Sequence, residues 1–393
     1  MFKAVLLGLT TLLLVSTPGW AKEATIKVLI ATDLPEAQVR TDGGYRVKNP
    51  QTGKTITRSL LSKNYQVLPM ATGLKWGEEF PGIYQITIAP RNADQPIIFN
   101  GAEYPGVLHI YQVERGLSVV NEVPVEAYVK LLLTNKLQGR PSTEVLSALV
   151  IAQRTSAYFD LQKGPTAYWQ VRAQEVGYFP RAIPTSIERV AKRTENMVLV
   201  SDTAPGKAFP AVWTENCGGK TAPYALLFRK GVAVSLPGVD APLALRDKGA
   251  SAWNYTLSKG DLAAAASLNS ISHINLFTDP HSGKVYSVRL FDGERWRDFD
   301  YFTFQKLVGS EHLVSSDFSV TVEEDQVHFH GYGEGHGVGL CLHSAEEMAK
   351  RGQNARDILK AFFPTTQIEV VSGETAALQP RRGSQPSLIR RSL

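Results

Sequence analysis

The sequence predicts an α+β fold in which mixed, β-rich parts and a few helices surround a cleft. From residue 24 to about 120 the chain is rich in β-branched and aromatic residues separated by turn signals. Two stretches with helical periodicity then follow between residues 124 and 162, and alternating strand patterns return after residue 197. We find no repeat of 20 to 50 residues, so a solenoid or propeller is not expected.

A secretory leader is predicted at residues 1–21. Lys3 precedes an apolar run over residues 4–15, and small residues lead up to Ala21. The run is too short to span a bilayer, no later stretch is long enough to do so, and no cysteine follows Ala21 to carry a lipid. We therefore expect an exported protein without a transmembrane segment, located in the periplasm or at the cell surface.

The formal charge of +5 overstates how basic the folded part is. Lys3 leaves with the leader, and the residues after Val371 carry a net charge of +3, which leaves the body near +1. A nucleic-acid groove normally needs a clustered basic face, so we expect no nucleic-acid partner. The end of the chain, 373–393, is predicted to be a disordered basic tail.

Strands and hairpins are expected over residues 22–116. Residues 25–30 and 83–88 are typical strands, and turns are indicated at Asp42-Gly43-Gly44, Asn49-Pro50 and Thr52-Gly53. We assign 22–116 to a β-rich N-terminal part and 117–372 to a second domain. The distinctive segments of the second domain are 120–164, 211–222 and 331–364.

Two helices open the second domain. Pro124 is pre-organised for a first helical position, and the helix that it starts continues through Leu132. A longer helix is expected from Ser142, as its cap, to Gln162, with Arg154 on its apolar stripe. A buried arginine needs a partner, so Arg154 either clamps a carboxylate or backbone carbonyls, which we favour, or contacts a ligand.

The remaining elements are shorter. We expect a helix over 187–191, strands over 197–200, 211–214, 286–290 and 318–322, and a further strand entering at 327–330. Ser344 with Glu347 predicts a capping box for a helix that ends near Gly352. A last helix over 358–363 stops at Pro364.

Glycine occupies every second position from Gly331 to Gly339. In an extended strand these glycines would form one face without side chains, opposite Tyr332, Glu334 and His336. Such a bare floor suits a flat, polar, extended ligand such as a polysaccharide. The alternative is a glycine-rich turn region or tight packing between two strands.

The two cysteines, Cys217 and Cys341, each lie in a glycine-rich segment. In an exported protein the pair can persist as a disulfide, which is the first interpretation. A metal site that uses both thiols with His336 or His343 is an alternative, although the close ligand spacing typical of zinc sites is missing. Two unpaired cysteines are the third possibility.

Four ordered motifs resemble those of SpoIID/LytB-type proteins, the stage II sporulation protein D and amidase enhancer family. They are VNEVPVEAY at 120–128, AQRTSAY at 152–158, NCGGKT at 216–221 and GHGVGLC at 335–341. The resemblance covers roughly 117–370. It implies peptidoglycan glycan strands as ligand, a cell-wall amidase as a second partner, and no cofactor. The implied substrate-binding residues are Arg154, Gly218, Gly219, Lys220, Tyr332, Gly335, His336 and Gly337.

The family includes lytic transglycosylases, in which one glutamate acts as general acid and then general base. Aligned without gaps, that glutamate corresponds to Lys136 here. Lysine has an ordinary pKa of about 10.4 and brings a positive charge near an oxocarbenium-like transition state. Leu342-His343-Ser344 likewise replaces a Gln-centred segment common in relatives.

Three interpretations follow from these departures. The protein binds glycan strands without cleaving them during cell-wall remodelling and recruits or stimulates an amidase. Alternatively, it cleaves glycan with a substitute acid, for which Glu334 and Glu215 are the candidates. Finally, it is a metal- or redox-dependent wall protein built on Cys217 and Cys341.

Overall fold

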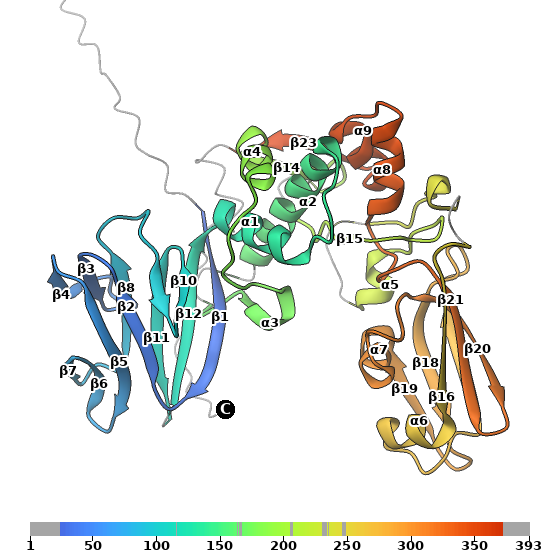
Figure 1. The fold of residues 1–393 in the computed structure, drawn as a ribbon, viewed down its shortest axis with the longest axis horizontal. Coiled ribbons are helices and arrows are strands. Elements are labelled where there is room, and N and C mark those ends of the chain that lie inside the picture. The colour runs from blue at the N-terminus through green and yellow to red at the C-terminus, as the bar shows by residue number, and fades with distance from the viewer. Residues whose placement is uncertain are drawn as a thin grey trace, which may run out of the picture.

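A computed structural model describes residues 24–371, except 115, 163, 165–166, 205–206, 230–233, 235 and 246–248. The predicted leader (1–21) and basic tail (373–393) lie outside the described residues. The α+β class is confirmed, with strands more abundant than helices along the described chain (Figure 1).

The N-terminal strands form two sheets whose inner faces share one core. The seven-stranded sheet has the order β13-β1-β12-β11-β8-β3-β4, and the six-stranded sheet has the order β10-β9-β2-β5-β6-β7. Their bounds are β1 Thr25–Leu34, β2 Ala37–Thr41, β3 Tyr45–Lys48, β4 Thr55–Ser59, β5 Lys63–Met70, β6 Gly73–Trp76, β7 Glu78–Pro81, β8 Gln85–Pro90, β9 Ile97–Phe99, β10 Ala102–Tyr104, β11 Val107–Val113, β12 Gly116–Pro124 and β13 Val171–Arg172. Alternate residues such as Ile26, Val28 and Val39 are fully buried between the sheets, as a half-buried strand requires.

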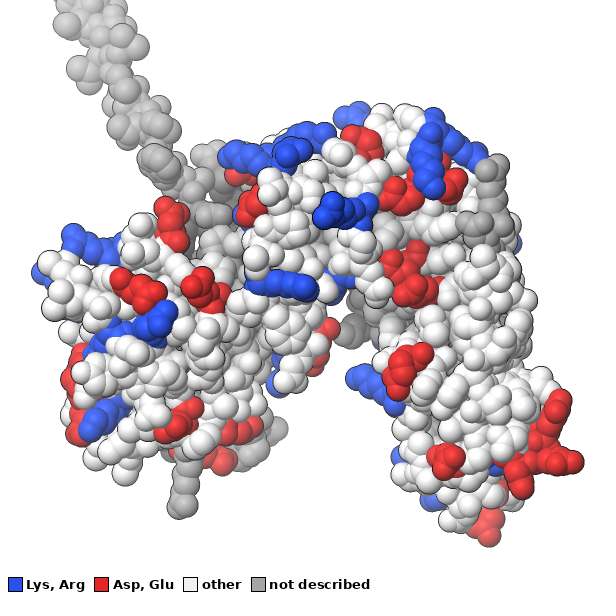
Figure 2. Space-filling view, viewed as in Figure 1, with Lys and Arg blue, Asp and Glu red and all other residues white. Residues whose placement is uncertain are grey.

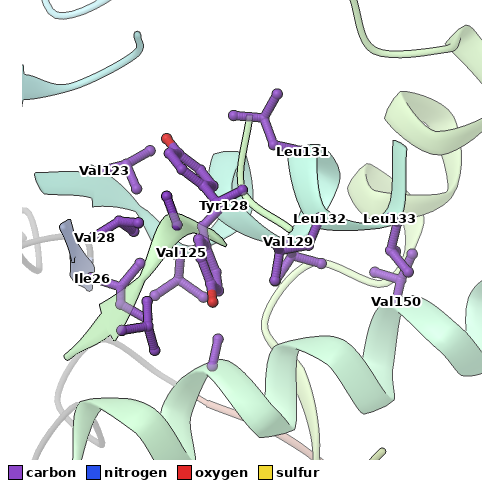
Figure 3. Close-up of a cluster of buried hydrophobic side chains, with 14 of the residues drawn as sticks. Ile26, Val28, Val123, Val125, Tyr128, Val129, Leu131, Leu132, Leu133 and Val150 are labelled. Carbon is purple, nitrogen blue, oxygen red and sulfur yellow. The ribbon is translucent and has the colours of Figure 1, made fainter. Parts of the chain in front are cut away.

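Helices cover one end of these sheets (Figure 1). They are α1 (Val125–Lys136), α2 (Thr143–Leu161), α3 (Ala173–Val176) and α4 (Thr185–Arg193). The helices α8 (Leu342–Lys350) and α9 (Ala355–Phe362) pack on α2, and the antiparallel strands β14 (Met197–Ser201) and β23 (Thr366–Val370) pair beside them. Figure 3 shows Val125 and Tyr128 of α1 next to Ile26, Val28 and Val123 of the sheet. This apolar contact fixes the orientation of α1 and therefore the position of its last residue, Lys136.

Arg154 is a structural clamp in the middle of α2. Its side chain is fully buried, and its Nε and Nη2 donate to the two carboxylate oxygens of Glu126 at 2.6 and 2.8 Å. Nη1 donates to the Met197 carbonyl at 2.9 Å. The clamp interpretation is therefore confirmed. The substrate-binding role expected for Arg154 stays a prediction, and in this structure its guanidinium contacts protein groups.

Residues 222–338 build a second core. Two three-stranded sheets flank it, β16-β21-β20 and β17-β18-β19. The elements are α5 (Tyr224–Phe228), the 3₁₀ turn η1 (Pro242–Leu245), β16 (Ala252–Ser258), α6 (Lys259–Ala266), β17 (His273–Thr278), β18 (Val285–Phe291), β19 (Trp296–Asp300), α7 (Tyr301–Val308), β20 (Asp317–Glu323) and β21 (Gln326–Tyr332). The chain leaves the first core at β15 (Trp213–Thr214) and returns at β22 (Leu340–Cys341), which pair in parallel.

The molecule has the shape of an arch. The N-terminal sheets form one arm, the second core forms the other, and the helices join them at the top (Figure 1). The space-filling view shows a hollow between the two arms, below the helices (Figure 2). Of the elements labelled in Figure 1, α3 lies on one side of this hollow and α5 and α7 lie on the other.

Most of the expected elements are present, and two boundaries are wrong. The expected strand over 211–214 is reduced to Trp213–Thr214. Ser344 does not cap a helix, because α8 begins at Leu342 after Cys341, which places Ser344 inside the helix and buries it. A capping box does occur ten residues later at α9, where Asn354 and Asp357 satisfy each other's backbone groups.

Candidate functional site

Lys136, the residue aligned with the family glutamate, lies where α1 ends, close to the end of α3. It is the last residue of α1, and a Cβ placed on Gly177 at the end of α3 would be 3.6 Å from its Cε. The Lys136 side chain is exposed to solvent, but protein groups surround much of it. Burial lowers the pKa of Lys136, and the nearby Asp160 carboxylate opposes that shift.

Asp160, near the end of α2, was not singled out in the sequence. Its charge acts on Lys136 and on Tyr224 of α5, so the carboxylate lies between the helices at the top and the second arm. Burial, with a smaller contribution from Asp160, raises the pKa of Tyr224 to about 12. Asp160 and Lys136 are thus opposite charges within electrostatic range of each other.

His336 lies on the second arm against an aromatic wall. The rings of Tyr224 and Phe228 stack 4.4 Å apart, Phe302 lies 5.0 Å from Phe228, and the His336 ring lies edge-on to Phe228 at 5.2 Å. Tyr224 and Phe228 are four residues apart on α5, so they share one helix face, a pairing that the sequence could have revealed.

His336 is neutral at ordinary pH. Burial and the Lys136 charge lower its pKa to about 4. Its Nδ1 accepts the Val338 N–H at 3.1 Å, which assigns the ring proton to Nε2. Since Lys136 acts on His336 electrostatically, the end of α1 and the glycine motif lie within range of each other across the hollow.

The glycine motif is not the extended strand that the sequence suggested. After β21 ends at Tyr332, Gly333, Gly335, Gly337 and Gly339 all have positive φ, between +67° and +90°. A Cβ at Gly333 would collide with the Asn216 carbonyl oxygen, and one at Gly339 with the Val212 carbonyl oxygen. The alternative interpretation, tight packing against another segment, is therefore confirmed, and the bare binding floor is wrong.

Glu215 and Glu334 meet in a separate pocket. Asn216 and Glu334 exchange backbone hydrogen bonds of 3.0 and 2.9 Å, so the two carboxylates approach each other in a cavity of about 560 Å³. His343, Glu346, Glu347 and Lys350 of α8 also line this cavity. Burial and the neighbouring Glu334 charge raise the pKa of Glu215 to about 7.

The other predicted binding residues have different surroundings. Lys220 lies 3.9 Å from Asp240, and the Tyr332 hydroxyl hydrogen-bonds to His330 Nε2 at 2.9 Å. Gly219 packs against Leu245.

Gly218 and Gly337 pack instead around a buried ion pair that the sequence did not reveal. It joins Lys284 and Asp317 at 2.8 Å. A Cβ at Gly218 would lie 2.8 Å from Asp317 Oδ2, and one at Gly337 would lie 2.8 Å from Lys284 Cε. These two glycines therefore make room for the ion pair.

The cysteine segments meet, but the expected disulfide is not formed. Cys217 and Cys341 are free, buried thiols, and the Cys217 N–H donates to Cys341 Sγ at 3.1 Å. Burial raises the pKa of the Cys341 thiol, but hydrogen bonds from Cys217 and from the Ser344 backbone outweigh it and lower the pKa overall. The Cys341 sulfur therefore acts as a hydrogen-bond acceptor at the start of α8.

Alkylation distinguishes the two cysteine states. Protein unfolded in urea without reductant should bind two equivalents of iodoacetamide, one at Cys217 and one at Cys341, as measured by intact mass. Absence of any mass increase, reversed by prior reduction, would establish the disulfide that the sequence suggested.

Two further findings concern metal-ligand groups and membrane-spanning helices. Within the described residues no group of three His, Cys, Asp or Glu side chains is placed to hold a metal ion. Over the same part of the chain, no helix combines the length and apolar character needed to cross a bilayer.

Comparisons with known proteins agree with the motifs. The family model described as SpoIID, Stage II sporulation protein, matches residues 113–200, which span α1 to α4 and include Lys136, Arg154 and Asp160. An uncharacterized protein of Brachyspira hyodysenteriae is 27% identical over 356 residues, covering 88% of this chain and 93% of the relative.

Two chlamydial relatives match a smaller part. An uncharacterized protein of Chlamydia pneumoniae is 30% identical over 158 residues, covering 40% of this chain and 57% of its own length. One from Chlamydia muridarum is 30% identical over 194 residues, covering 48% and 66%. This chain thus spans less than two thirds of either chlamydial protein. Residues 113–200 thus match the model of the SpoIID family, a cell-wall-associated family, and the ordered motifs agree with this match.

Proposed function

We propose that this protein binds peptidoglycan glycan strands in the hollow between its arms and acts in cell-wall remodelling. The observation that supports this most directly is the pairing of an aromatic wall with charged groups across the hollow. Phe228, Phe302 and His336 supply apolar ring surface, and Lys136 and Asp160 supply a cation and an anion.

These side chains suit a glycan. Sugar rings present C–H groups on their faces and hydroxyls at their edges, so they require flat apolar surface beside hydrogen-bonding groups. The Lys136 ammonium adds an attraction for the lactyl carboxylate of muramic acid, which is free once a stem peptide has been removed. An amidase is therefore the class of enzyme that would supply this ligand.

Co-sedimentation with purified sacculi tests the binding. The mature protein should pellet with sacculi, and more strongly after amidase treatment has removed the stem peptides. Phe228→Ala should weaken this binding because it deletes the centre of the aromatic wall. The matched control is Tyr84→Ala, which removes an exposed ring on the N-terminal arm. Equal recovery with and without sacculi, or an equal loss in both variants, would contradict the proposal.

A second candidate function, glycan cleavage with a substitute acid, is supported by the Glu215–Glu334 pocket. A carboxyl group with a pKa of about 7 holds a proton near neutral pH and can donate it to a leaving oxygen. Glu334 lies beside it and raises that pKa further. A pair of carboxyl groups that flank the scissile bond is the usual requirement for acid–base cleavage of a glycosidic bond.

The pH profile tests this second function. If Glu215 is the general acid, product release from glycan strands should fall as the pH rises through about 7, because the acid form is lost. Glu334→Gln removes the neighbouring charge, so the fall in product release should occur at lower pH. Glu215→Gln should abolish product release. Release that persists in Glu215→Gln with an unchanged profile would exclude Glu215. Such a result would leave the binding proposal untouched.

A further inference from the structure

Three arginines gather on the outer face of the N-terminal arm, far from the hollow. Arg46 of β3 and Arg58 of β4 are directly opposite each other across the strand pair at the sheet edge. Both line a groove of about 840 Å³ with Arg91, which follows β8. Figure 2 shows Lys and Arg at the end of the molecule where Figure 1 places β3 and β4.

Among the described residues, no acidic side chain pairs with these three guanidinium groups. Over the described part of the chain, neither an ion pair nor a side-chain hydrogen bond involves Arg46, Arg58 or Arg91. Other arginines are paired: Arg154 with Glu126 and Arg289 with Asp298, for example. Like charges directly opposite each other destabilise a strand pair, so the Arg46–Arg58 pair favours an external anion.

Two exposed leucines follow β4: Leu60 lines the same groove, and Leu61 is the next residue in the chain. Leu60 and Leu61 are 71% and 76% exposed. The turn that presents them is fixed, because the Leu61 N–H donates to Ser59 Oγ at 3.0 Å. Leucine is usually buried, and two adjacent, fully presented leucines beside three cations form an edge that is both apolar and basic.

We propose that this arginine–leucine edge docks on the surface of an anionic lipid bilayer. The guanidinium groups would bind lipid phosphates, for which their planar, multiple-donor shape is well suited. Leu60 and Leu61 would enter the interface between headgroups and acyl chains. Stable peripheral binding generally needs both an electrostatic and an apolar contribution, and this edge offers the two side by side. A free phosphate or a soluble polyanion would leave the leucines without a role, which is why the geometry points to a membrane.

Vesicle flotation tests the inference with the full mature chain. We expect the protein to float with vesicles of phosphatidylcholine and phosphatidylglycerol, to bind vesicles of phosphatidylcholine alone much more weakly, and to be released by salt. Arg46→Gln with Arg58→Gln should reduce binding by roughly fivefold per charge removed. Leu60→Ser with Leu61→Ser should also weaken binding to the anionic vesicles at low salt, because it removes the apolar contribution.

The controls use residues elsewhere in the chain. Arg189→Gln with Arg356→Gln removes the same charge from two exposed helical sites and should change binding little. The arginines of the predicted tail are common to every variant and so do not affect the comparison. Because Arg46→Gln relieves a repulsion between exposed side chains, the melting temperature should not fall.

Several outcomes would overturn the inference. Equal binding to neutral and anionic vesicles, or equal losses in the paired and the control arginine variants, would exclude this edge. Loss with the arginine pair, no effect of the leucine pair, and full competition by a soluble polyphosphate would identify a soluble polyanion site instead.

Discussion

Replacing Lys136 by glutamate should create or strongly increase release of 1,6-anhydro glycan products from peptide-stripped strands. The substitution places a carboxyl group at the position of the family acid. The partly buried site and the Asp160 charge, which act on Lys136 now, would both raise the pKa of that carboxyl group. A positioned general acid–base typically contributes about 10²- to 10⁴-fold, so the gain should be visible over a weak background.

Lys136→Ala is the matched control because it removes the ammonium group without supplying an acid. Product release should remain at the wild-type level in this variant. Proton NMR gives an independent readout. The pKa of His336, about 4 beside the Lys136 ammonium, should rise in both variants and more in Lys136→Glu. Robust wild-type cleavage that is abolished by Glu334→Gln and unaffected by Lys136→Ala would refute this expectation and favour Glu334 as the acid.

Arg154→Met should lower the free energy of unfolding by about 3–5 kcal/mol, the usual result of removing one member of a buried ion pair. The substitution leaves the Glu126 carboxylate without its two donors and the Met197 carbonyl without its hydrogen bond. Chemical denaturation followed by circular dichroism measures the loss. The effect should be large because α1 and α2 are joined through this clamp, and α1 carries Lys136.

The double variant Arg154→Met/Glu126→Leu separates the clamp from other roles. Removing both charges should recover most of the lost stability, since replacement of a buried ion pair by apolar residues is often close to neutral. The double variant should also keep its binding to sacculi. A stable Arg154→Met protein that has lost binding would instead support a ligand contact of Arg154.

Local patterns predicted the elements well, and they did so for physical reasons. The period of two in residues 25–30 and the period near 3.6 in the helix after Ser142 reflect burial of one face, which any core would impose. Helix boundaries were less secure. Ser344 and Glu347 have the spacing of a capping box, but the return of the chain to β15 through Leu340 and Cys341 starts α8 two residues earlier than Ser344.

The candidate site depended on contacts between distant segments. Glu334 and Glu215 were both candidates by motif, yet only the backbone hydrogen bonds between Asn216 and Glu334 bring their carboxylates into one pocket. Asp160 carried no sequence signal, because its relation to Lys136 and Tyr224 exists only when α2 and α5 meet at the hollow.

The sequence by itself determined the α+β class, most of the helices and strands, the SpoIID-type motifs and the lysine at the position of the family acid. The tertiary structure decided that the alternating glycines make room for neighbouring backbone and for Lys284, that Arg154 is a clamp, and that Arg46 lies opposite Arg58 on the paired strands. This division follows from how far apart in the sequence the interacting residues lie. Periodicity and turn chemistry act over a few residues, whereas a contact such as that between Cys217 and Cys341 joins positions 124 residues apart and is set by packing of the whole chain.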